Sequence, residues 1–292
     1  MAKQTLPFRE PGTVGLIGGS GKMGALFRPL FEQDGVEVLV AGRTTELTYE
    51  RLVELADVVI VTVPVKETVA LIRRIAPRLR AGQLFSDFTS VKGEPVAAML
   101  SSGASVIGCH PVFGPMADLR GQKVVLCPER PGPFLAWYRE FFQRHGMQVI
   151  EMTPAAHDEA MAFIQGLTHF LNISFARTLQ TRGADLEALL EVCSPVYRML
   201  FAALCRILSG DRHLYSQIQV SNPGSVPVVA EFLQNGADLL DRVTRNDLEG
   251  VNRIFRESAE YLGDFKEEAR RESDFLIAEL GRFLRDQTPG GG

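Results

Sequence analysis

The chain has few cysteines, no strong excess of either charge and no long apolar run. Its 4 cysteines among 292 residues are scattered, without a CxxC pair or a spacing typical of a metal site. Free thiols of this kind are typical of proteins from the reducing cytosol. We therefore expect a cytoplasmic protein that has neither a disulfide framework nor a bound metal.

The charge balance and the apolar pattern exclude further classes of protein. The net charge is −4 and acidic and basic residues are interspersed, which argues against nucleic acid or a membrane surface as partner. The longest apolar run has about the length of one buried strand, far short of a membrane span. Residues 1–12 lack the apolar core of a signal peptide. An apolar fraction of 46% nevertheless provides a sizeable core for one large or two ordinary domains.

The first half of the chain alternates strand and helix patterns. The expected strands are 13–18, 36–41, 57–64, 84–88, 105–109, 123–127 and 148–152, and the expected helices are 23–33, 66–79, 94–100 and 132–144. Strands that alternate with helices predict an α/β fold with a doubly wound parallel sheet. We expect this Rossmann-type dinucleotide-binding domain to span residues 1–153.

The second half carries only helical patterns. They cover residues 155–181, 194–210, 223–235 and 239–284, with Gly236 and Gly263 as breaks. Ser194 and Pro195 suit the N-cap and the first position of a helix. We expect an all-helical, substrate-binding domain over 154–286 and a flexible tail at 287–292.

A glycine-rich turn at residues 19–24 follows the first predicted strand and opens a helix. Gly19, Gly21 and Gly24 allow a tight turn, close approach to a pyrophosphate and close packing of helix on strand. An ordinary glycine-rich turn is the alternative, but the complete strand–helix–strand context favours a dinucleotide site. The residues assigned to the cofactor are Gly19, Ser20, Gly21, Lys22, Met23, Gly24, Arg43, Thr44, Val63 and Pro64.

The end of the second strand bears on the choice between NAD and NADP. An acidic residue usually stands there and binds the ribose hydroxyls of NAD. This chain has Gly42-Arg43-Thr44-Thr45 instead, with no carboxylate before Glu46. Arg43 can hold the 2′-phosphate of NADP or can stack on adenine, so both cofactors stay open.

His110 stands in the segment GCHPVFGP at 108–115, just past a predicted strand. Ligands bind at this carboxyl edge of an open α/β sheet, and a neutral histidine suits proton acceptance near pH 7. A loop histidine bonded to a backbone carbonyl is the alternative; the proline-rich frame and the nearby nucleotide site favour a catalytic base. Ser90 and Lys92 follow the fourth strand and face the same edge, in reach of cofactor or substrate, although a plain strand–helix turn explains them almost as well.

Arg198 has no acidic neighbour at helical spacing and lies near the positive end of its predicted helix. Such a cation suits a substrate carboxylate bound by the guanidinium fork, and an ion pair with a distant acid is equally open. A polar stripe, Gln165, Thr168, His169 and Asn172, runs along an otherwise apolar helix and is expected to line a wet cleft. We expect His157, beside Asp158, in a solvated first turn without a complete metal site.

Taken together, these motifs resemble the prephenate dehydrogenase family, most closely the dehydrogenase half of the bacterial enzymes that are fused to chorismate mutase. The resemblance runs from about Val14 to Leu284. It rests on GGSGKMG at 18–24, TSVK at 89–92, HPVFGP at 110–115, MAFIQGLTHF at 161–170 and SPVYR at 194–198. Several motifs in the right order make the resemblance specific.

The resemblance implies oxidative decarboxylation of a cyclohexadienyl acid, with a hydride passing from ring carbon 4 to NAD(P). His110 would accept the proton of the ring hydroxyl and Arg198 would bind a carboxylate, while Ser90, His169, Gln165 and Lys92 would line the site. The ring carboxylate leaves as CO2 and aromatisation drives the step. The resemblance also implies a homodimer built through the helical domain, a role in tyrosine biosynthesis and, in some members, inhibition by tyrosine.

Two departures leave the substrate open. The chain begins at the nucleotide-binding strand, without the mutase helix of the fused enzymes, and Arg43-Thr44 replaces the usual acid. Both features suit a specialised relative as well, such as a 4-amino-4-deoxyprephenate dehydrogenase of antibiotic synthesis, and arogenate is a third candidate substrate. A β-hydroxyacid dehydrogenase or imine reductase would usually carry a lysine on the first long interdomain helix, where this chain has Gln165 and His169. A cofactor-sensing scaffold would need neither His110 nor Arg198.

Overall fold

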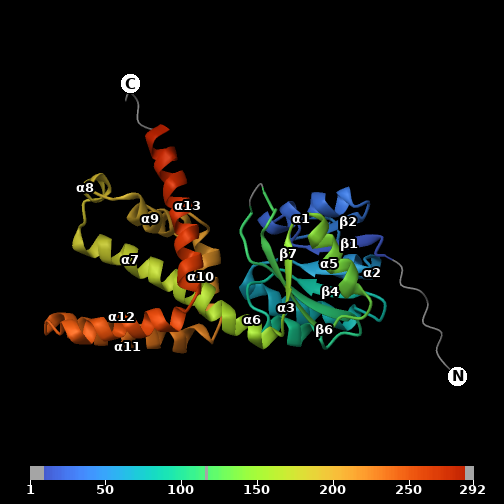
Figure 1. Cartoon of the computed structure of the whole chain (residues 1–292). Coiled ribbons are helices and arrows are strands. Elements are labelled where there is room, and N and C mark those ends of the chain that lie inside the picture. Colours follow the sequence, from blue (N-terminus) through green and yellow to red (C-terminus); the bar gives the residue numbers. More distant parts are fainter. Residues whose placement is uncertain (1–9, 116–117, 287–292) are drawn as a thin grey trace. The chain divides into compact units, whose positions relative to one another are not determined.

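The computed structural model describes residues 10–115 and 118–286. The tail expected at 287–292 lies outside the described residues. The chain divides into two compact units, which we describe separately (Figure 1). The first, here called the sheet unit, runs up to Gln165 and includes Ser216–Ser225, and the second, the helical unit, comprises Gly166–Tyr215 and the chain from Val226 onward.

The sheet unit contains one seven-stranded sheet in the order β2-β1-β3-β4-β5-β6-β7. Its strands are β1 Thr13–Ile17, β2 Glu37–Ala41, β3 Val58–Val61, β4 Leu84–Asp87, β5 Ser105–Pro111, β6 Lys123–Arg130 and β7 Gln148–Glu151. The central strands are β-branched and buried on both faces, as a parallel sheet between helices requires. The chain adds β2 on one side of β1 and then returns to add β3 on the other side. The position between β1 and β3 is therefore the topological switch point, where open α/β sheets bind ligands.

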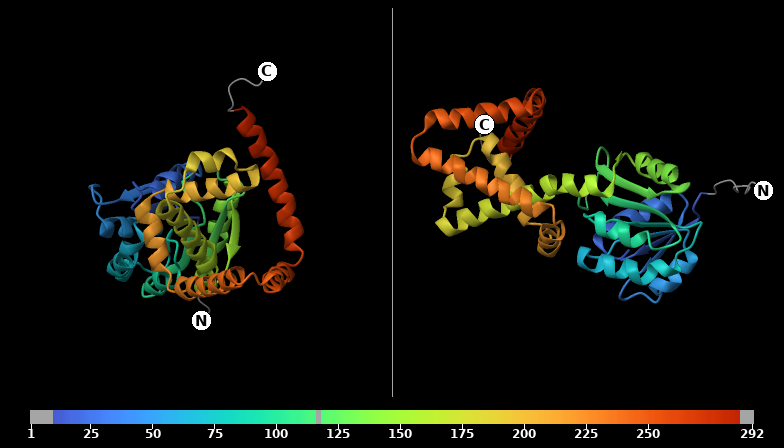
Figure 2. Two further views of the ribbon diagram at one scale, coloured as in Figure 1. Left: turned by 90° about the vertical axis from the view of Figure 1, so that its left-hand side faces the viewer. Right: turned by 90° about the horizontal axis from the view of Figure 1, so that it is seen from below.

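Helices cover both faces of the sheet (Figure 2). They are α1 Lys22–Gln33, α2 Tyr49–Leu55, α3 Val65–Ile75 with the 3₁₀ turn Ala76–Arg78, α4 Gly93–Met99 and α5 Phe134–Arg144. Aromatic residues of α1 and α5 form the core on one face, where the rings of Phe31 and Phe141 stack at 4.1 Å. Aliphatic residues of α2, α3 and α4 form the core on the other face.

The sheet is mostly parallel, with one reversal that the sequence analysis did not predict. Strands β5 and β6 pair antiparallel, and His110 lies opposite Val125. The parallel crossover expected between them is absent because the connection from Pro111 to Lys123 contains no helix among its described residues. β5 also runs two residues further than predicted, so that His110 belongs to the strand itself and not to the loop after it.

The polypeptide leaves the sheet through one continuous helical stretch. It consists of α6 Pro154–Met161, a π-helical segment Ala162–Leu167 and α7 Thr168–Arg182. The boundary between the sheet unit and the helical unit falls inside this stretch, after Gln165. The sequence pattern changes earlier, at residue 153. α6 groups with the sheet because it bonds to the start of α4: the Asp158 carboxylate accepts the backbone N–H groups of Lys92 and Gly93 at 2.7 and 2.8 Å.

The rest of the chain is helical. The remaining helices are α8 Leu186–Glu191, α9 Pro195–Leu208, α10 Arg212–Ser221, α11 Ser225–Thr244, α12 Leu248–Leu262 and α13 Phe265–Asp286. Ser194 is the N-cap residue of α9, as predicted. Gly236 does not end a helix, because one glycine costs an interior turn only about 1 kcal/mol and α11 continues through it. Helices α2, α8 and α10 were not predicted.

No helix among the described residues is long and apolar enough to cross a membrane. The same part of the chain contains no group of His, Cys, Asp and Glu side chains that could hold a metal ion.

Candidate active site

A glycine cradle (Gly18–Gly24) lies where β1 meets α1. Gly18 has a φ of +86°, which a residue with a side chain rarely adopts. A Cβ on Gly24 would lie 2.4 Å from the Cα of Gly19, so only glycine lets the helix start this close to the turn. Gly21 is the N-cap residue of α1 and forms no side-chain hydrogen bond there, and the N-terminus of a helix attracts anionic groups.

The loops after β2 and β3 lie beside this cradle. A Cβ on Gly42 would lie 3.4 Å from the hydroxyl of Ser20, and Val63 lies within 3.0 Å of a Cβ built on Gly18. Thr45 shapes the first loop by bonding to the backbone of Gly42 and Leu47. Arg43 and Thr44 are exposed on this loop, and Pro64 is exposed at the start of α3. The residues assigned to the cofactor therefore gather at the ends of three adjacent strands.

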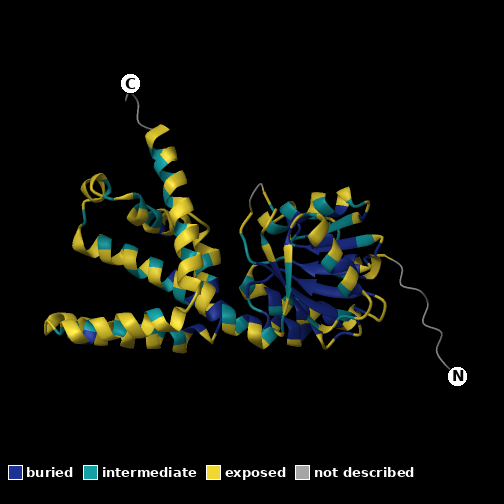
Figure 3. Cartoon of the chain, viewed as in Figure 1, coloured by how far each residue is buried: buried dark blue, intermediate teal, exposed yellow. Residues whose placement is uncertain are grey.

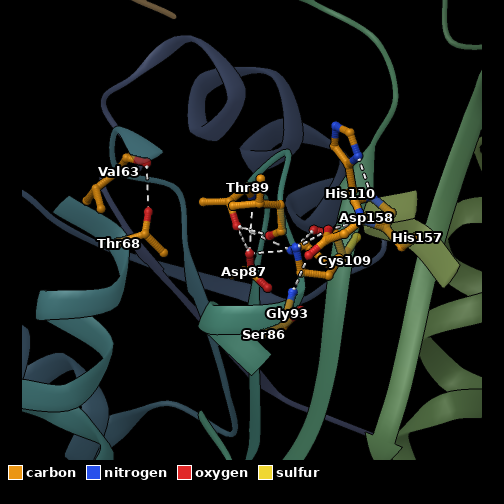
Figure 4. Close-up of polar contacts among 12 residues, drawn as sticks. Val63, Thr68, Ser86, Asp87, Thr89, Gly93, Cys109, His110, His157 and Asp158 are labelled. Atoms are coloured by element: carbon orange, nitrogen blue, oxygen red, sulfur yellow. Dashed lines mark hydrogen bonds and ion pairs between the residues drawn. The ribbon is translucent and has the colours of Figure 1, made fainter. Parts of the chain in front are cut away.

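His110 lies on β5, two strands from β3 at the same sheet edge, and only 4% of it is exposed. Its Nδ1 is 2.8 Å from Nε2 of His157, and Nδ1 of His157 is 2.8 Å from a carboxylate oxygen of Asp158 (Figure 4). We call these three residues the imidazole chain. Between residues 10 and 286, leaving aside 116 and 117, no hydrogen bond reaches the other ring nitrogen of His110, Nε2.

Burial and charge keep His110 neutral. Its removal from water lowers its pKa well below the ordinary histidine value, and the nearby His157 and Lys92 add to this effect. Burial disfavours the ionised form of Asp158, but hydrogen bonds from His157 and from the backbone of Gly93 and Lys92 outweigh it and lower the pKa of that carboxyl. The imidazole chain thus has the carboxylate of Asp158 at one end and the neutral imidazole of His110 at the other.

His157 is fully buried, which corrects the expectation of a solvated first turn. Sequence spacing placed it on the first turn of a helix, and that is right: Thr153 caps α6 and Pro154 opens it. The turn is covered because α6 packs on α4 and on β6. The adjacent pair His157-Asp158 is the signal in the sequence from which this contact could have been predicted.

Lys92 does not suit direct contact with a substrate, contrary to the sequence-based expectation. It is fully buried and forms an ion pair with Asp87, and its ammonium also donates to the hydroxyl of Thr89 at 3.3 Å and to the carbonyl of Cys109 at 2.8 Å. A Cβ on Gly108 would lie 3.1 Å from Cδ of Lys92, so this glycine makes room for the lysine. Lys92 thus links the end of β4, through Asp87, to the backbone of β5 at Cys109, immediately before His110.

Ser90 follows β4 at the same edge and is 7% exposed. Its hydroxyl is buried and has no hydrogen-bond partner among the residues described. A buried hydroxyl without a partner is costly, and a ligand that bonds to it would remove that cost. Asn222, which the sequence analysis missed, anchors Ser216–Ser225 by donating to the carbonyl of Asp158 at 2.7 Å.

The polar stripe does not form one regular face, because a π-helix covers Ala162–Leu167 and changes the spacing before Thr168. Gln165 is half-buried in the sheet unit, and the amide of Asn172 bonds to the carbonyl of Thr168 in its own helix. His169 is buried in the helical unit against the ring of Tyr215, at 4.9 Å. Desolvation lowers its pKa, and its Nδ1 has no partner in the described chain.

Arg198 lies in the first turn of α9 in the helical unit and is half-buried. Where the structure describes the chain, its guanidinium forms no ion pair, while most other arginines do. Whether Arg198 pairs with a distant acid or with the carboxylate of a substrate therefore stays a prediction. The sheet unit and the helical unit are described separately, so the expectation that Arg198 and His110 share a pocket stays a prediction.

Two family profiles match the chain. Residues 36–151 match the family described as "Prephenate dehydrogenase, nucleotide-binding domain" and residues 153–257 match "Prephenate dehydrogenase, dimerization domain". The glycine cradle precedes the first match.

The sequence is also similar to curated proteins along most of its length. It is 32% identical over 289 residues to a probable arogenate/prephenate dehydrogenase of Methanocaldococcus jannaschii (92% of this chain, 65% of the relative). It is 33% identical over 267 residues to the T-protein of Haemophilus influenzae (90% and 71%), and 29% identical over 276 residues to the 4-amino-4-deoxyprephenate dehydrogenase of Streptomyces pristinaespiralis (88% and 93%). The chain thus spans just under two thirds of the archaeal relative.

A crystal structure of prephenate dehydrogenase from A. aeolicus, in complex with hydroxyphenyl propionate and NAD+, has the same fold. The TM-score is 0.69 at 18% identity, and the match covers 90% of this chain and all of that one. The two profile matches in succession and the similarity to the T-protein give one answer: the chain belongs to the prephenate dehydrogenase family.

Proposed function

We propose that the protein oxidises and decarboxylates a prephenate-type cyclohexadienyl acid, giving a 4-substituted phenylpyruvate and a reduced nicotinamide dinucleotide. One observation carries the proposal. In a member of this family, His110 is held through Nδ1 while Nε2 has no partner in the described chain, and it lies at the sheet edge that also carries the glycine cradle.

The residues of the cradle fit a dinucleotide. Gly24 and Gly19 leave room for the close start of α1, and the N-terminus of this helix attracts the negative pyrophosphate. When bound, the nicotinamide supplies the acceptor for the hydride from ring carbon 4. Ser20, Lys22 and Met23 complete the turn, and Val63 and Pro64 border it.

Arg43 and Thr44 favour NADP, and the family resemblance favours NAD. No carboxylate stands between Ala41 and Glu46 to bind a free ribose 2′-hydroxyl. We propose that Arg43 binds the 2′-phosphate. Replacing Arg43 by alanine then weakens NADP binding by roughly ten- to a hundredfold, the value of one charge-assisted hydrogen bond, and leaves NAD binding unchanged. Equal loss for both cofactors would show that Arg43 stacks on adenine instead.

His110 accepts the hydroxyl proton of the substrate at Nε2 as the hydride leaves. The bond between the ring and its carboxylate breaks in the same conversion, CO2 departs, and the electron pair of that bond completes the aromatic ring. The ring oxygen then takes the proton back from His110, so that the product is the phenol and the neutral base is restored. Arg198 holds a substrate carboxylate, and Ser90, His169 and Gln165 line the ring site. Lys92 acts indirectly, by fixing the backbone before His110.

Prephenate is the substrate that we propose, with 4-hydroxyphenylpyruvate as the product and tyrosine biosynthesis in the cytoplasm as the pathway. Arogenate and 4-amino-4-deoxyprephenate are the alternatives, because one of the similar proteins is a probable arogenate/prephenate dehydrogenase and another is a 4-amino-4-deoxyprephenate dehydrogenase. They differ from prephenate in the side chain or in the group on ring carbon 4.

We also propose a homodimer built through the helical unit. The second family profile is described as a dimerization domain, and large apolar side chains of the helical unit are exposed, among them Phe255, Phe275 and Phe283. Contiguous exposed apolar surface is typical of such interfaces.

The proposed reaction is tested by turnover of the purified protein. Prephenate, arogenate and 4-amino-4-deoxyprephenate are each assayed with NAD and with NADP, and both reduced nicotinamide and released CO2 are measured. We expect equal amounts of the two products with prephenate. Hydride transfer without CO2 release, or no turnover of any of the three acids, would refute the proposed function.

A further inference from the structure

The direction of each hydrogen bond in the imidazole chain follows from the acceptor at its end. An ionised carboxylate only accepts, so Nδ1 of His157 carries the hydrogen that Asp158 receives. A neutral His157 then has a lone pair on Nε2. The 2.8 Å contact with His110 holds one hydrogen, and this hydrogen must therefore belong to Nδ1 of His110.

We propose that His157 and Asp158 are positioning residues that set the tautomer of His110, leaving Nε2 unprotonated for the substrate and passing the accepted charge toward the Asp158 carboxylate. This inference rests on the proposed function for its catalytic meaning, while the tautomer itself is a property of the free protein. Without the hydrogen bonds of the imidazole chain, His110 would populate two neutral tautomers. One of them carries its hydrogen on Nε2 and cannot accept a proton there.

The same contacts explain how a buried base can take up a proton. When Nε2 of His110 receives the hydroxyl proton, the hydrogen on Nδ1 can move to Nε2 of His157. The positive charge then lies on His157, 2.8 Å from Asp158, where it is stabilised despite burial. One proton enters and one shifts along a preformed hydrogen bond, so charge and atoms balance.

Asp158 is built to stay ionised. Its two oxygens accept the N–H groups of Lys92 and Gly93 as well as that of His157. A Cβ on Gly93 would lie 3.0 Å from the carboxylate, so glycine lets the oxygen come this close. The carboxylate thereby joins the start of α4 to the imidazole chain.

The groups around His110 come from several elements. His157 and Asp158 lie on α6, the Lys92–Asp87 ion pair lies between β4 and α4, and the Cys109 thiol adjoins it on β5. Burial raises the pKa of the Cys109 thiol, so it stays neutral, and the lysine and aspartate compensate each other.

The first experiment records the ¹⁵N signals of the histidine rings in the free protein near neutral pH. His110→Asn and His157→Phe identify the signals. We expect a protonated Nδ1 and an unprotonated Nε2 for His110, a pattern that His157→Phe and Asp158→Asn convert to a mixture of tautomers. An N–H at Nε2 of His110 in the unaltered protein would overturn the proposal, whatever the enzyme does.

The second experiment measures turnover across pH with the same variants. Loss of an orienting partner of a histidine typically costs roughly ten- to a hundredfold, and we expect such a loss in kcat for His157→Phe and Asp158→Asn, with little change in KM and an altered acidic limb. Asp158→Glu should restore part of the loss. Unchanged kcat and an unchanged pH profile in His157→Phe would overturn the positioning role.

Asn222→Ala is the matched control, because Asn222 also bonds to Asp158 but through the backbone carbonyl, outside the imidazole chain. We expect lower stability with the tautomer of His110 and the pH profile unchanged. A tautomer shift in this variant equal to that in His157→Phe would mean that any disturbance of α6 suffices, and would overturn the proposal. The expected tautomer in a protein that turns over none of the three acids would refute the proposed function alone.

Discussion

The sheet unit and the helical unit bury their apolar side chains to very different extents (Figure 3). Both cores of the sheet unit consist of buried residues from strands and helices, and most of these are fully buried. Among the described residues of the helical unit, only Leu204 is a buried apolar residue, while Val192, Phe255 and Tyr261 are at least 77% exposed. The sheet unit therefore has its own core, and the helical unit gains stability from whatever covers its apolar surface.

The chemistry is divided in a similar way. The imidazole chain and the Lys92–Asp87 pair are complete within the sheet unit. The helical unit contains Arg198, which forms no ion pair within the described residues, and His169, whose Nδ1 has no hydrogen-bond partner there. We infer that the sheet unit orients the base His110 without a ligand, whereas Arg198 and His169 would gain their polar partners only from a bound ligand.

The largest effect is expected from removal of the base His110. His110→Asn should lower kcat by about two to four decades, equivalent to roughly 3–5 kcal/mol in the transition state, while binding of the dinucleotide stays intact. Stopped-flow turnover and cofactor titration measure the two properties. Unaltered turnover would remove His110 from the mechanism.

A matched pair of phenylalanines tests the difference in packing. Phe27 is fully buried in α1 and Phe255 is 77% exposed in α12. Phe27→Ala should reduce the free energy of unfolding by about 3–5 kcal/mol, and Phe255→Ala should change that of a dilute sample by less than about 0.5 kcal/mol. Denaturant unfolding measures both, and equal losses would contradict the contrast between the units.

Arg198→Ala should act on binding where His110→Asn acts on turnover. Loss of one charge-assisted contact to a carboxylate is expected to raise KM by roughly ten- to a hundredfold. Arg198→Lys keeps the charge but loses the fork and should recover only part of this. An unaltered KM in the alanine variant would exclude the carboxylate contact.

The stability of the helical unit should depend on protein concentration. If a second copy covers its apolar surface, each tenfold dilution costs about 1.4 kcal/mol per dimer. Hydrogen exchange of α9, α12 and α13 at several concentrations measures this, with β1–β5 as the internal reference. Exchange rates that do not change with dilution, in a sample that light scattering shows to be monomeric, would contradict the dimer.

The smallest expected effect is the response of the sheet unit to acid. The lowered pKa of His110 keeps it neutral in the folded protein, whereas the unfolded chain takes up a proton below about pH 6.5. Its contribution to stability is therefore complete above that pH and is lost as the pH falls below it, by at most about 1.4 kcal/mol per pH unit. Unfolding curves of the unaltered protein and of His110→Asn should differ in this slope, and identical slopes would show that His110 titrates normally.

Local patterns predicted much of this fold correctly. The glycine cradle, the strands β1–β4 and the N-cap of α9 were predicted because each depends on residues that are neighbours in sequence. The helices α2, α8 and α10 were missed because they are short or are interrupted by polar residues, so that their own periodicity gives a weak signal. The strand β6 was predicted, but its antiparallel direction was missed, because strand direction depends on the path of a connection and not on the composition of the strand.

For the candidate site, too, local sequence predicted some features, and tertiary contacts decided the others. His110 could be selected from its proline-rich frame, its place just past a predicted strand and the nucleotide site at the same sheet edge, but its position within β5 could not be predicted. Lys92 gave the signal of an exposed polar residue after a strand, and only the pairing with Asp87 and Cys109 showed that it is internal. His157 looked solvated because its sequence neighbours are charged, although α4 and β6 cover it.

By itself, the sequence determined which chemical groups are available: the glycines that a dinucleotide needs, one histidine near them, an arginine without a local partner and two segments of different periodicity. The tertiary structure alone decided which of these groups touch. Only there do His110, His157 and Asp158, residues on β5 and α6, become a single hydrogen-bonded chain. The physical reason is that periodicity and capping act over a few residues, whereas the protonation of a buried imidazole is set by whichever distant groups the fold packs against it.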